Sequence, residues 1–167
     1  MKMLRDLLAI KRFREDQAQA VVRERRQALL QVQQQRLDAE ALLARLLAEG
    51  MLAEQQLYTD LCARMVRLRE IEDVYLAVAA LRQREQLQQD ALDAAQRALE
   101  AAEQHFEQAR SQHKEAARQT SKFIDLASSF ASVEALESER REDLEMEEAA
   151  SVVREREEWN VSDGESS

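Results

Sequence analysis

The second half of the chain repeats apolar or small residues at alternating spacings of four and three. The series runs through Gln88, Leu92, Ala95, Leu99, Ala102, Phe106, Ala109, His113, Ala116, Thr120, Phe123, Ala127 and Phe130. A repeat of about 3.5 residues per turn keeps one seam of a helix against a partner helix, as in a left-handed coiled coil. The pattern therefore predicts a long helix that packs along this seam.

The first 57 residues carry a seam of the same spacing. It runs through Leu4, Leu8, Lys11, Glu15, Ala18, Val22, Arg25, Leu29, Val32, Arg36, Ala39, Leu43, Leu46, Gly50, Ala53 and Leu57. Other apolar residues widen the face beside it, namely Leu7, Ile10, Val21, Leu30, Leu37, Leu42 and Leu47. A wide face indicates contact with more than one partner helix. The alternative is a single helix pair with spare apolar residues on its flank.

The heptad phase fails between these two halves. Asp60, Arg64 and Arg67 occupy three successive seam positions, and the phase recovers at Ile71. We predict a helical hairpin whose tip lies near residues 62–70, with arms of roughly 60 residues, or about 90 Å each. Gly50 is a competing position for the turn, because glycine is common just past the end of a helix. One unbroken helix that pairs in a homodimer is the third arrangement.

The amino-acid usage favours uninterrupted helices. The 167 residues include no proline and only two glycines, aromatic residues make up 4 %, and charged residues 34 %. Ala, Leu, Glu, Gln and Arg predominate, and all are good helix formers. The predicted fold class is all-α, with two long helices in an antiparallel coiled-coil hairpin over residues 1–150. We expect an acidic, largely disordered tail over 151–167, after a frayed helix that begins near 134.

Charge is distributed unevenly along the chain. Residues 1–26 hold eight Lys/Arg against four acids, whereas residues 134–167 hold thirteen acids against four Arg, and the whole chain carries −9. This balance argues against nucleic acid as a partner. No apolar run approaches the ~20 residues that span a bilayer, so we expect no membrane insertion. The single cysteine, Cys62, excludes an internal disulfide and fits a reducing compartment.

No motif in the chain indicates chemistry. The two glycines, Gly50 and Gly164, cannot form a phosphate-binding loop. The two histidines, His105 and His113, lie eight residues apart, too far for a metal pair on adjacent helical turns. The sequence therefore predicts a protein that is not an enzyme, with no catalytic residue, no metal site and no cofactor.

Two surfaces are candidates for protein binding. The tip surface comprises Leu57, Tyr58, Leu61, Arg64, Arg67 and Arg69. The open-end surface comprises Lys11, Arg12, Arg14, Lys122 and Phe123. Arg and Tyr are favoured at protein interfaces, and residues 121–127 supply more large apolar side chains than one seam buries. The alternative is a local structural role, closing the hairpin at the tip and thickening the core at the open end.

Several features together resemble a known family. They are the basic and hydrophobic start MKMLRDLLAIKRFRE, the proline-free hairpin, His-Lys-Glu at 113–115, Lys-Phe-Ile-Asp-Leu at 122–126, and the acidic end. This organisation resembles the YscO family of bacterial type III secretion systems, which is similar in architecture to flagellar FliJ. The resemblance covers about residues 2–150.

The resemblance implies a specific role. Such proteins are stalks in the bacterial cytoplasm, peripheral to the inner-membrane export apparatus, and carry no catalytic residues. They contact the hexameric secretion ATPase and the cytoplasmic ring of the export gate, and some bind secretion chaperones. By analogy, the open end would enter the ATPase ring and the tip would face the gate. Whether such a protein is itself secreted stays open.

The leading hypothesis is a monomeric, non-enzymatic stalk that couples the secretion ATPase to the export gate. The alternative is a homo-oligomeric scaffolding coiled coil with no ATPase partner, which would dimerise through the wide apolar face of residues 29–57. A third hypothesis is a chaperone-like adaptor that masks helices of secreted clients with an exposed Met/Leu face.

Overall fold

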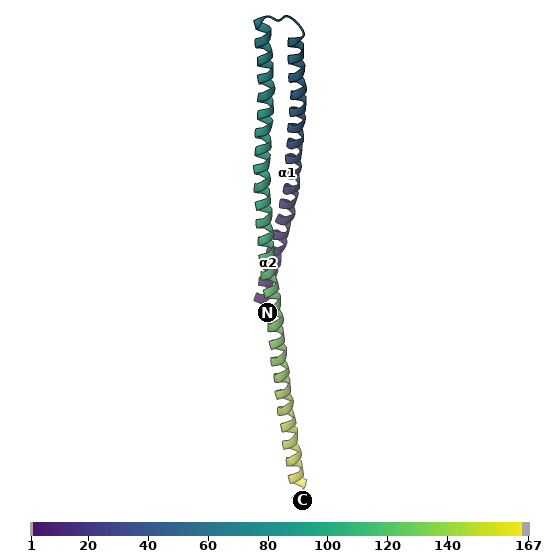
Figure 1. Ribbon diagram of the computed structural model, residues 1–167. Helices are drawn as coiled ribbons and strands as arrows, with labels where there is room; N and C mark the ends of the chain where they lie inside the picture. The colour runs from purple at the N-terminus through teal and green to yellow at the C-terminus, as the bar shows by residue number, and fades with distance from the viewer. Residues whose placement is uncertain (1, 165–167) are drawn as a thin grey trace. The chain divides into compact units, whose positions relative to one another are not determined.

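The computed structural model describes residues 2–164 and is helical on both sides of one turn (Figure 1). Helix α1 spans Lys2–Cys62 and helix α2 spans Leu68–Gly164. Contacts divide the described chain into two compact units. Unit 1 contains residues 2–15 and 116–164, and unit 2 contains residues 16–115.

The two helices of unit 2 run antiparallel. The side-chain amide of Gln88 donates to the carbonyl of Ala39 at 3.0 Å, and Arg84 pairs with Glu49 at 3.6 Å. Closer to the turn, Arg64 lies 4.0 Å from Glu70. As the residue number on α1 rises, the number of its partner on α2 falls, so the two helices run antiparallel and form a hairpin. The prediction of an all-α fold with two long antiparallel helices is confirmed.

Burial follows the predicted seam. All residues that are buried within the described chain lie at seam positions: Leu43, Leu46, Gly50, Glu85, Leu99, Ala109 and Thr120. Glu85 takes the seam position between Leu81 and Gln88. Most other seam residues are half-buried, because two helices cover only one stripe of each other. The seam of the helix pair is therefore the one that the heptad spacing predicts.

The turn occupies residues 63–67, within the range 62–70 that the loss of heptad phase indicates. The amide of Ala63 donates to the carbonyl of Thr59 at 3.1 Å and extends the last turn of α1. The amides of Glu70 and Ile71 both donate to the carbonyl of Arg67, which begins α2. No residue from 2 to 164 has a positive φ, so this turn forms without glycine.

Gly50 does not end a helix, so the competing prediction of a turn at this residue is wrong. Helix α1 continues through Gly50, which is buried against Glu85 of α2. A Cβ atom at this position would overlap Oε1 of Glu85 and lie 3.5 Å from its Cδ. A larger residue here would therefore require the Glu85 carboxylate to move. The turn at 63–67 also excludes a single unbroken helix.

In unit 1, residues 2–15 pack against the stretch that begins at Ala116. The hydroxyl of the buried Thr120 donates to the carbonyl of Ala116 at 3.0 Å and lies 3.3 Å from that of Lys11. From residue 128 to residue 164 every side chain is exposed. Here the structure differs from the expected disorder, because α2 stays helical through Gly164. This stretch has no earlier glycine and no proline to stop it. The expected tail residues 165–167 lie outside the described residues, and the division at residue 150 stays a prediction.

Candidate functional site

A polar cluster interrupts the apolar seam of unit 2. We call it the Glu85 notch, formed by Gly50, Glu54, Arg82 and Glu85. Arg82 donates to Oε2 of Glu85 at 3.0 Å and also pairs with Glu54 across the seam. The hydrogen bond to Glu85, with the negative charges of Glu54 and Glu85, raises the pKa of Arg82 above its ordinary value. The buried carboxylate of Glu85 therefore faces a fixed cation.

The heptad spacing did not point to the Glu85 notch. A hollow of about 210 Å³ beside it is lined by Leu46, Glu49, Gly50, Ala53, Leu81, Arg84 and Glu85. Its carboxylates already have arginine partners, since Glu49 pairs with Arg84 and Glu85 with Arg82. A glycine and a glutamate at seam positions could have indicated the notch. That they lie opposite each other could be seen only once the pairing of α1 with α2 was known.

The tip surface lies at the turn of unit 2. Leu57 and Leu61 are half-buried against the seam, whereas Tyr58 is 40 % exposed. Arg64 bridges the turn toward Glu70, and Arg67 supplies the carbonyl that starts α2. The side chains of all three predicted arginines are exposed. The structure thus brings the predicted tip residues together, with two leucines serving the hairpin and Tyr58 and the arginines facing solvent.

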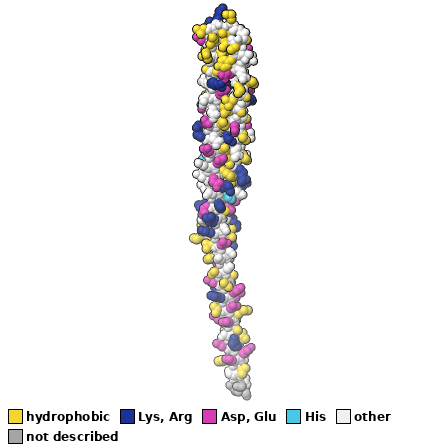
Figure 2. Space-filling view, in the orientation of Figure 1, with side chains coloured by type: hydrophobic (Ala, Val, Ile, Leu, Met, Phe, Trp, Pro, Cys, Tyr) yellow, Lys and Arg dark blue, Asp and Glu magenta, His cyan; other side chains and the backbone are white. Residues whose placement is uncertain are grey.

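Apolar residues outside the predicted set extend the tip surface. Met65, Leu68, Tyr75 and Leu76 are strongly exposed, and Met65 is fully so. Figure 2 shows hydrophobic side chains gathered near the turn, with basic side chains at its apex. Met adapts to irregular partner surfaces, and Arg and Tyr are enriched in interfaces. This end of unit 2 has the composition of a protein-binding surface.

The open-end surface lies in unit 1 and divides into two groups. Lys11 and Phe123 occupy facing seam positions, where the Lys11 ammonium lies 5.2 Å from the ring centroid of Phe123. Both are half-buried, so they stabilise the helix pair. Arg12, Arg14 and Lys122 are exposed. The surface available to a partner is therefore basic.

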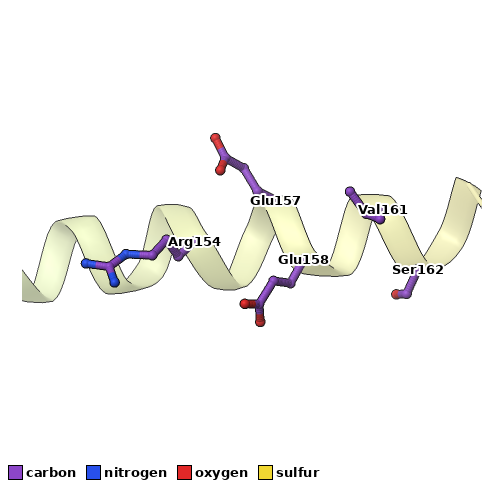
Figure 3. Close-up of a pocket in the computed structure, with 5 residues that line it drawn as sticks. All are labelled: Arg154, Glu157, Glu158, Val161 and Ser162. Atoms are coloured by element: carbon purple, nitrogen blue, oxygen red, sulfur yellow. The ribbon is translucent and has the colours of Figure 1, made fainter.

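A hollow of about 360 Å³ near the end of α2 is lined by Arg154, Glu157, Glu158, Val161 and Ser162. Figure 3 shows that all five side chains project from one stretch of helix, with no second element opposite them. Residues 2–164 contain no group of His, Cys, Asp and Glu that could hold a metal ion.

No described helix has a stretch that is both long and apolar enough to cross a bilayer. The two candidate surfaces are those at the turn of unit 2 and around Arg12 and Lys122 of unit 1. Both present side chains suited to protein contacts.

Comparison with known proteins agrees with this architecture. The family model of type III secretion protein YscO matches residues 4–152. A crystal structure of the type III secretion protein YscO from Vibrio parahaemolyticus is similar, with a TM-score of 0.83 and 24 % sequence identity. The alignment covers 88 % of this chain and 92 % of that chain, and it shows a shared fold. No curated protein matches this chain. The family model spans most of the two-helix structure, and the chain belongs to the YscO family, whose members are components of the type III secretion apparatus.

Proposed function

We propose that this chain is a non-enzymatic stalk that couples the hexameric secretion ATPase to the cytoplasmic ring of the export gate. The observation that carries the proposal is a YscO-family hairpin with two different exposed surfaces, one basic and one mixed arginine and apolar. The stalk acts in the cytoplasm, at the periphery of the inner-membrane export apparatus. Secretion chaperones are further partners under this proposal.

The open-end surface is suited to a ring-shaped partner. Arg12 and Arg14 lie on α1 and Lys122 lies on α2, so cations face solvent from both helices of unit 1. A hexameric ring presents six equivalent surfaces, whereas one asymmetric helix pair offers a different side chain to each. Unequal contacts bias the nucleotide states of the ring subunits or transmit their motion. Exposed charge also speeds the encounter with an acidic surface, and salt weakens that effect.

The tip surface is suited to the gate. Met65, Leu68 and Tyr75 offer exposed apolar area, and Arg67 and Arg69 flank it with charge. This mixture matches the core and rim of a protein interface. Because the tip surface lies in unit 2 and the open-end surface in unit 1, each can be altered without changing the other.

The test measures ATP hydrolysis by the cognate secretion ATPase with and without the purified chain. We expect stimulation by the wild type and a loss of about tenfold in apparent affinity for Arg12→Glu/Arg14→Glu, since two attractive charges become repulsive. Arg67→Glu/Arg69→Glu is the matched control, which should stimulate normally and fail instead to bind the purified gate ring. A wild-type chain that neither binds nor stimulates the ATPase at micromolar concentration would contradict the proposal.

A second candidate function rests on a separate observation. Leu30, Leu37, Leu47, Met51 and Leu52 are all exposed on α1 within unit 2. A homo-oligomeric scaffold with no ATPase partner would bury this face of residues 29–57 between copies. Under that function Leu47→Glu/Met51→Glu would abolish self-association, and the ATPase would be unaffected by the wild-type chain.

A further inference from the structure

Helix α1 carries a second heptad-spaced row of residues, on the side of the helix away from the seam. Nine residues of unit 2 form this row and step by four and three, as the seam does. They are Leu30, Gln34, Leu37, Ala41, Ala44, Ala48, Met51, Gln55 and Tyr58. All nine are exposed and none is charged. We call them the outer row, which keeps to one side of α1 over a length of about 42 Å.

The row at the same heptad positions of α2 has a different composition. Within unit 2 it consists of Leu76, Ala79, Gln83, Gln86, Asp90, Asp93, Arg97, Glu100, Gln104 and Glu107. Five of these ten exposed residues are charged, and Gln86 donates to Asp90 within the row at 3.0 Å. Such a row is typical of a helix surface that stays in water. The outer row of α1 has instead the composition of a seam.

The outer row reads in the same chemical order in both directions. From either end it runs through a large apolar residue, a glutamine, a second large apolar residue and then alanine. Ala44 is its centre, so Gln34 mirrors Gln55 and Leu37 mirrors Met51. A two-fold axis at Ala44 therefore places like residues beside like in two antiparallel copies. Neither a different partner nor a parallel copy requires such an order.

The large residues of the outer row have apolar area to bury. Leu30, Leu37 and Met51 are 60 %, 52 % and 59 % exposed in the single chain. Leu47 and Leu52 lie beside the row and are exposed as well. A second copy supplies the same side chains from the other direction, so each apolar end of one row meets an apolar end of the other. Removing this area from water favours association.

The alanines and glutamines of the outer row set the geometry of a pair. The three central alanines carry only a methyl group each, so two helices can approach closely there. A side-chain amide both donates and accepts, so Gln34 of one copy can bond to Gln55 of the other. Gln34 donates to Asp38 at 2.9 Å, which leaves its amide oxygen as the acceptor for this bond. Polar residues within a seam fix register and orientation in coiled coils.

We propose that two copies of the protein associate through their outer rows, antiparallel and with the two-fold axis at Ala44. The pair is closed, because each copy uses its only outer row. The inference holds with or without an ATPase partner and rests on neither function proposed above. The open-end surface contributes no residue to the outer row, whereas Tyr58 belongs to both the row and the tip surface. Association and tip binding therefore compete for Tyr58.

The first experiment measures molar mass by light scattering across a dilution series of the full chain. We expect the mass to double with one midpoint. Ala44→Glu should raise the midpoint concentration at least about tenfold, because the carboxylates of both copies meet near the axis. Ala94→Glu is the matched control, which makes the same change at an exposed alanine of α2 in unit 2 and should leave the midpoint unchanged. Circular dichroism checks that both variants are folded.

Charge exchange at the two glutamines tests the orientation. Gln34→Glu/Gln55→Glu should raise the midpoint concentration at least about tenfold, since carboxylates from the two copies meet. Gln34→Glu/Gln55→Lys should stay within about threefold of the wild type, because opposite charges meet in an antiparallel pair. In a parallel pair each introduced charge meets its own kind, and both variants dissociate. That result would overturn the proposed arrangement.

Two further outcomes of the dilution series would contradict the pairing. A monomeric mass at every concentration would overturn it together with the scaffold function, and would leave the ATPase measurement of the stalk unaffected. A dimer that Ala44→Glu and Ala94→Glu weaken equally, or that neither weakens, would place the contact outside the outer row.

Discussion

Two stretches of α2 are both helical and have different surroundings. Around Glu85 the helix packs against α1, and its seam residues are buried or half-buried. From residue 128 to residue 164 every side chain of the same helix is exposed. Both stretches are rich in helix-forming residues, so local propensity accounts for helix in both. Packing against a partner, which provides most helical stability in proteins, is present only in the first.

The largest contrast should come from proline in each stretch. Ala109→Pro removes a helical hydrogen bond at a buried seam position and should lower the free energy of unfolding by about 3 kcal/mol or more. Ala149→Pro makes the same change in the exposed stretch and should alter the cooperative transition by less than about 0.5 kcal/mol. Urea unfolding followed by circular dichroism at low micromolar concentration measures both. Equal losses would show that residues 128–164 belong to the cooperative core.

A smaller contrast compares neighbouring leucines. Leu46 is buried in the seam and Leu47, the next residue, is exposed. Leu46→Ala should destabilise unit 2 by about 2 kcal/mol, since it removes apolar area and leaves a cavity. Leu47→Ala should stay within about 0.5 kcal/mol of wild type. Thermal unfolding distinguishes them, and a larger effect at Leu47 would mean that a further helix covers this face.

The Glu85 notch allows a sharper test of the seam. Alanine is favoured over glycine within helices by about 1 kcal/mol, but a Cβ at Gly50 would overlap the Glu85 carboxylate. We therefore expect Gly50→Ala to stabilise the Glu85→Ala variant by about 1 kcal/mol and to give no gain in the wild type. The double-mutant cycle should return a coupling of about 1–2 kcal/mol. Additive effects would show that Glu85 does not occupy the notch.

We expect the end of α2 to be the least stable part of the described helices. Backbone amides of residues 137–164 should exchange with solvent within about tenfold of the unfolded rate, since opening this stretch breaks no contact with another helix. Amides of the seam near Leu46 and Leu99 should exchange only when unit 2 unfolds. Slow exchange over 137–164 at a concentration where the protein is monomeric would contradict both the expected fraying and the lack of packing.

The heptad spacing alone predicted the two helices, the residues of their seam and the neighbourhood of the turn. Each of these depends on the periodicity of apolar residues, which the sequence displays directly. The loss of phase at Asp60, Arg64 and Arg67 located the turn because polar side chains are costly in a seam. No special turn residue was required, since the turn avoids positive φ.

Single positions within the seam were less predictable. Gly50 was compatible with either a helix end or a space for another side chain, and only the facing Glu85 distinguishes them. Lys11 and Phe123 were proposed as binding residues, but their contact with each other places them in the helix pair. Residue type does not reveal whether a side chain near the seam is turned to the partner helix or to solvent.

The most direct test of the stalk function is hydrogen exchange of the full chain, alone and with the purified secretion ATPase. We predict new protection over residues 2–15 and 116–127, around Arg12, Arg14 and Lys122, with little change at the turn residues 63–67. The Arg12→Glu/Arg14→Glu variant should show no such protection. Unchanged exchange throughout the chain at saturating ATPase, or protection confined to the turn, would contradict the proposal that the open end engages the ATPase.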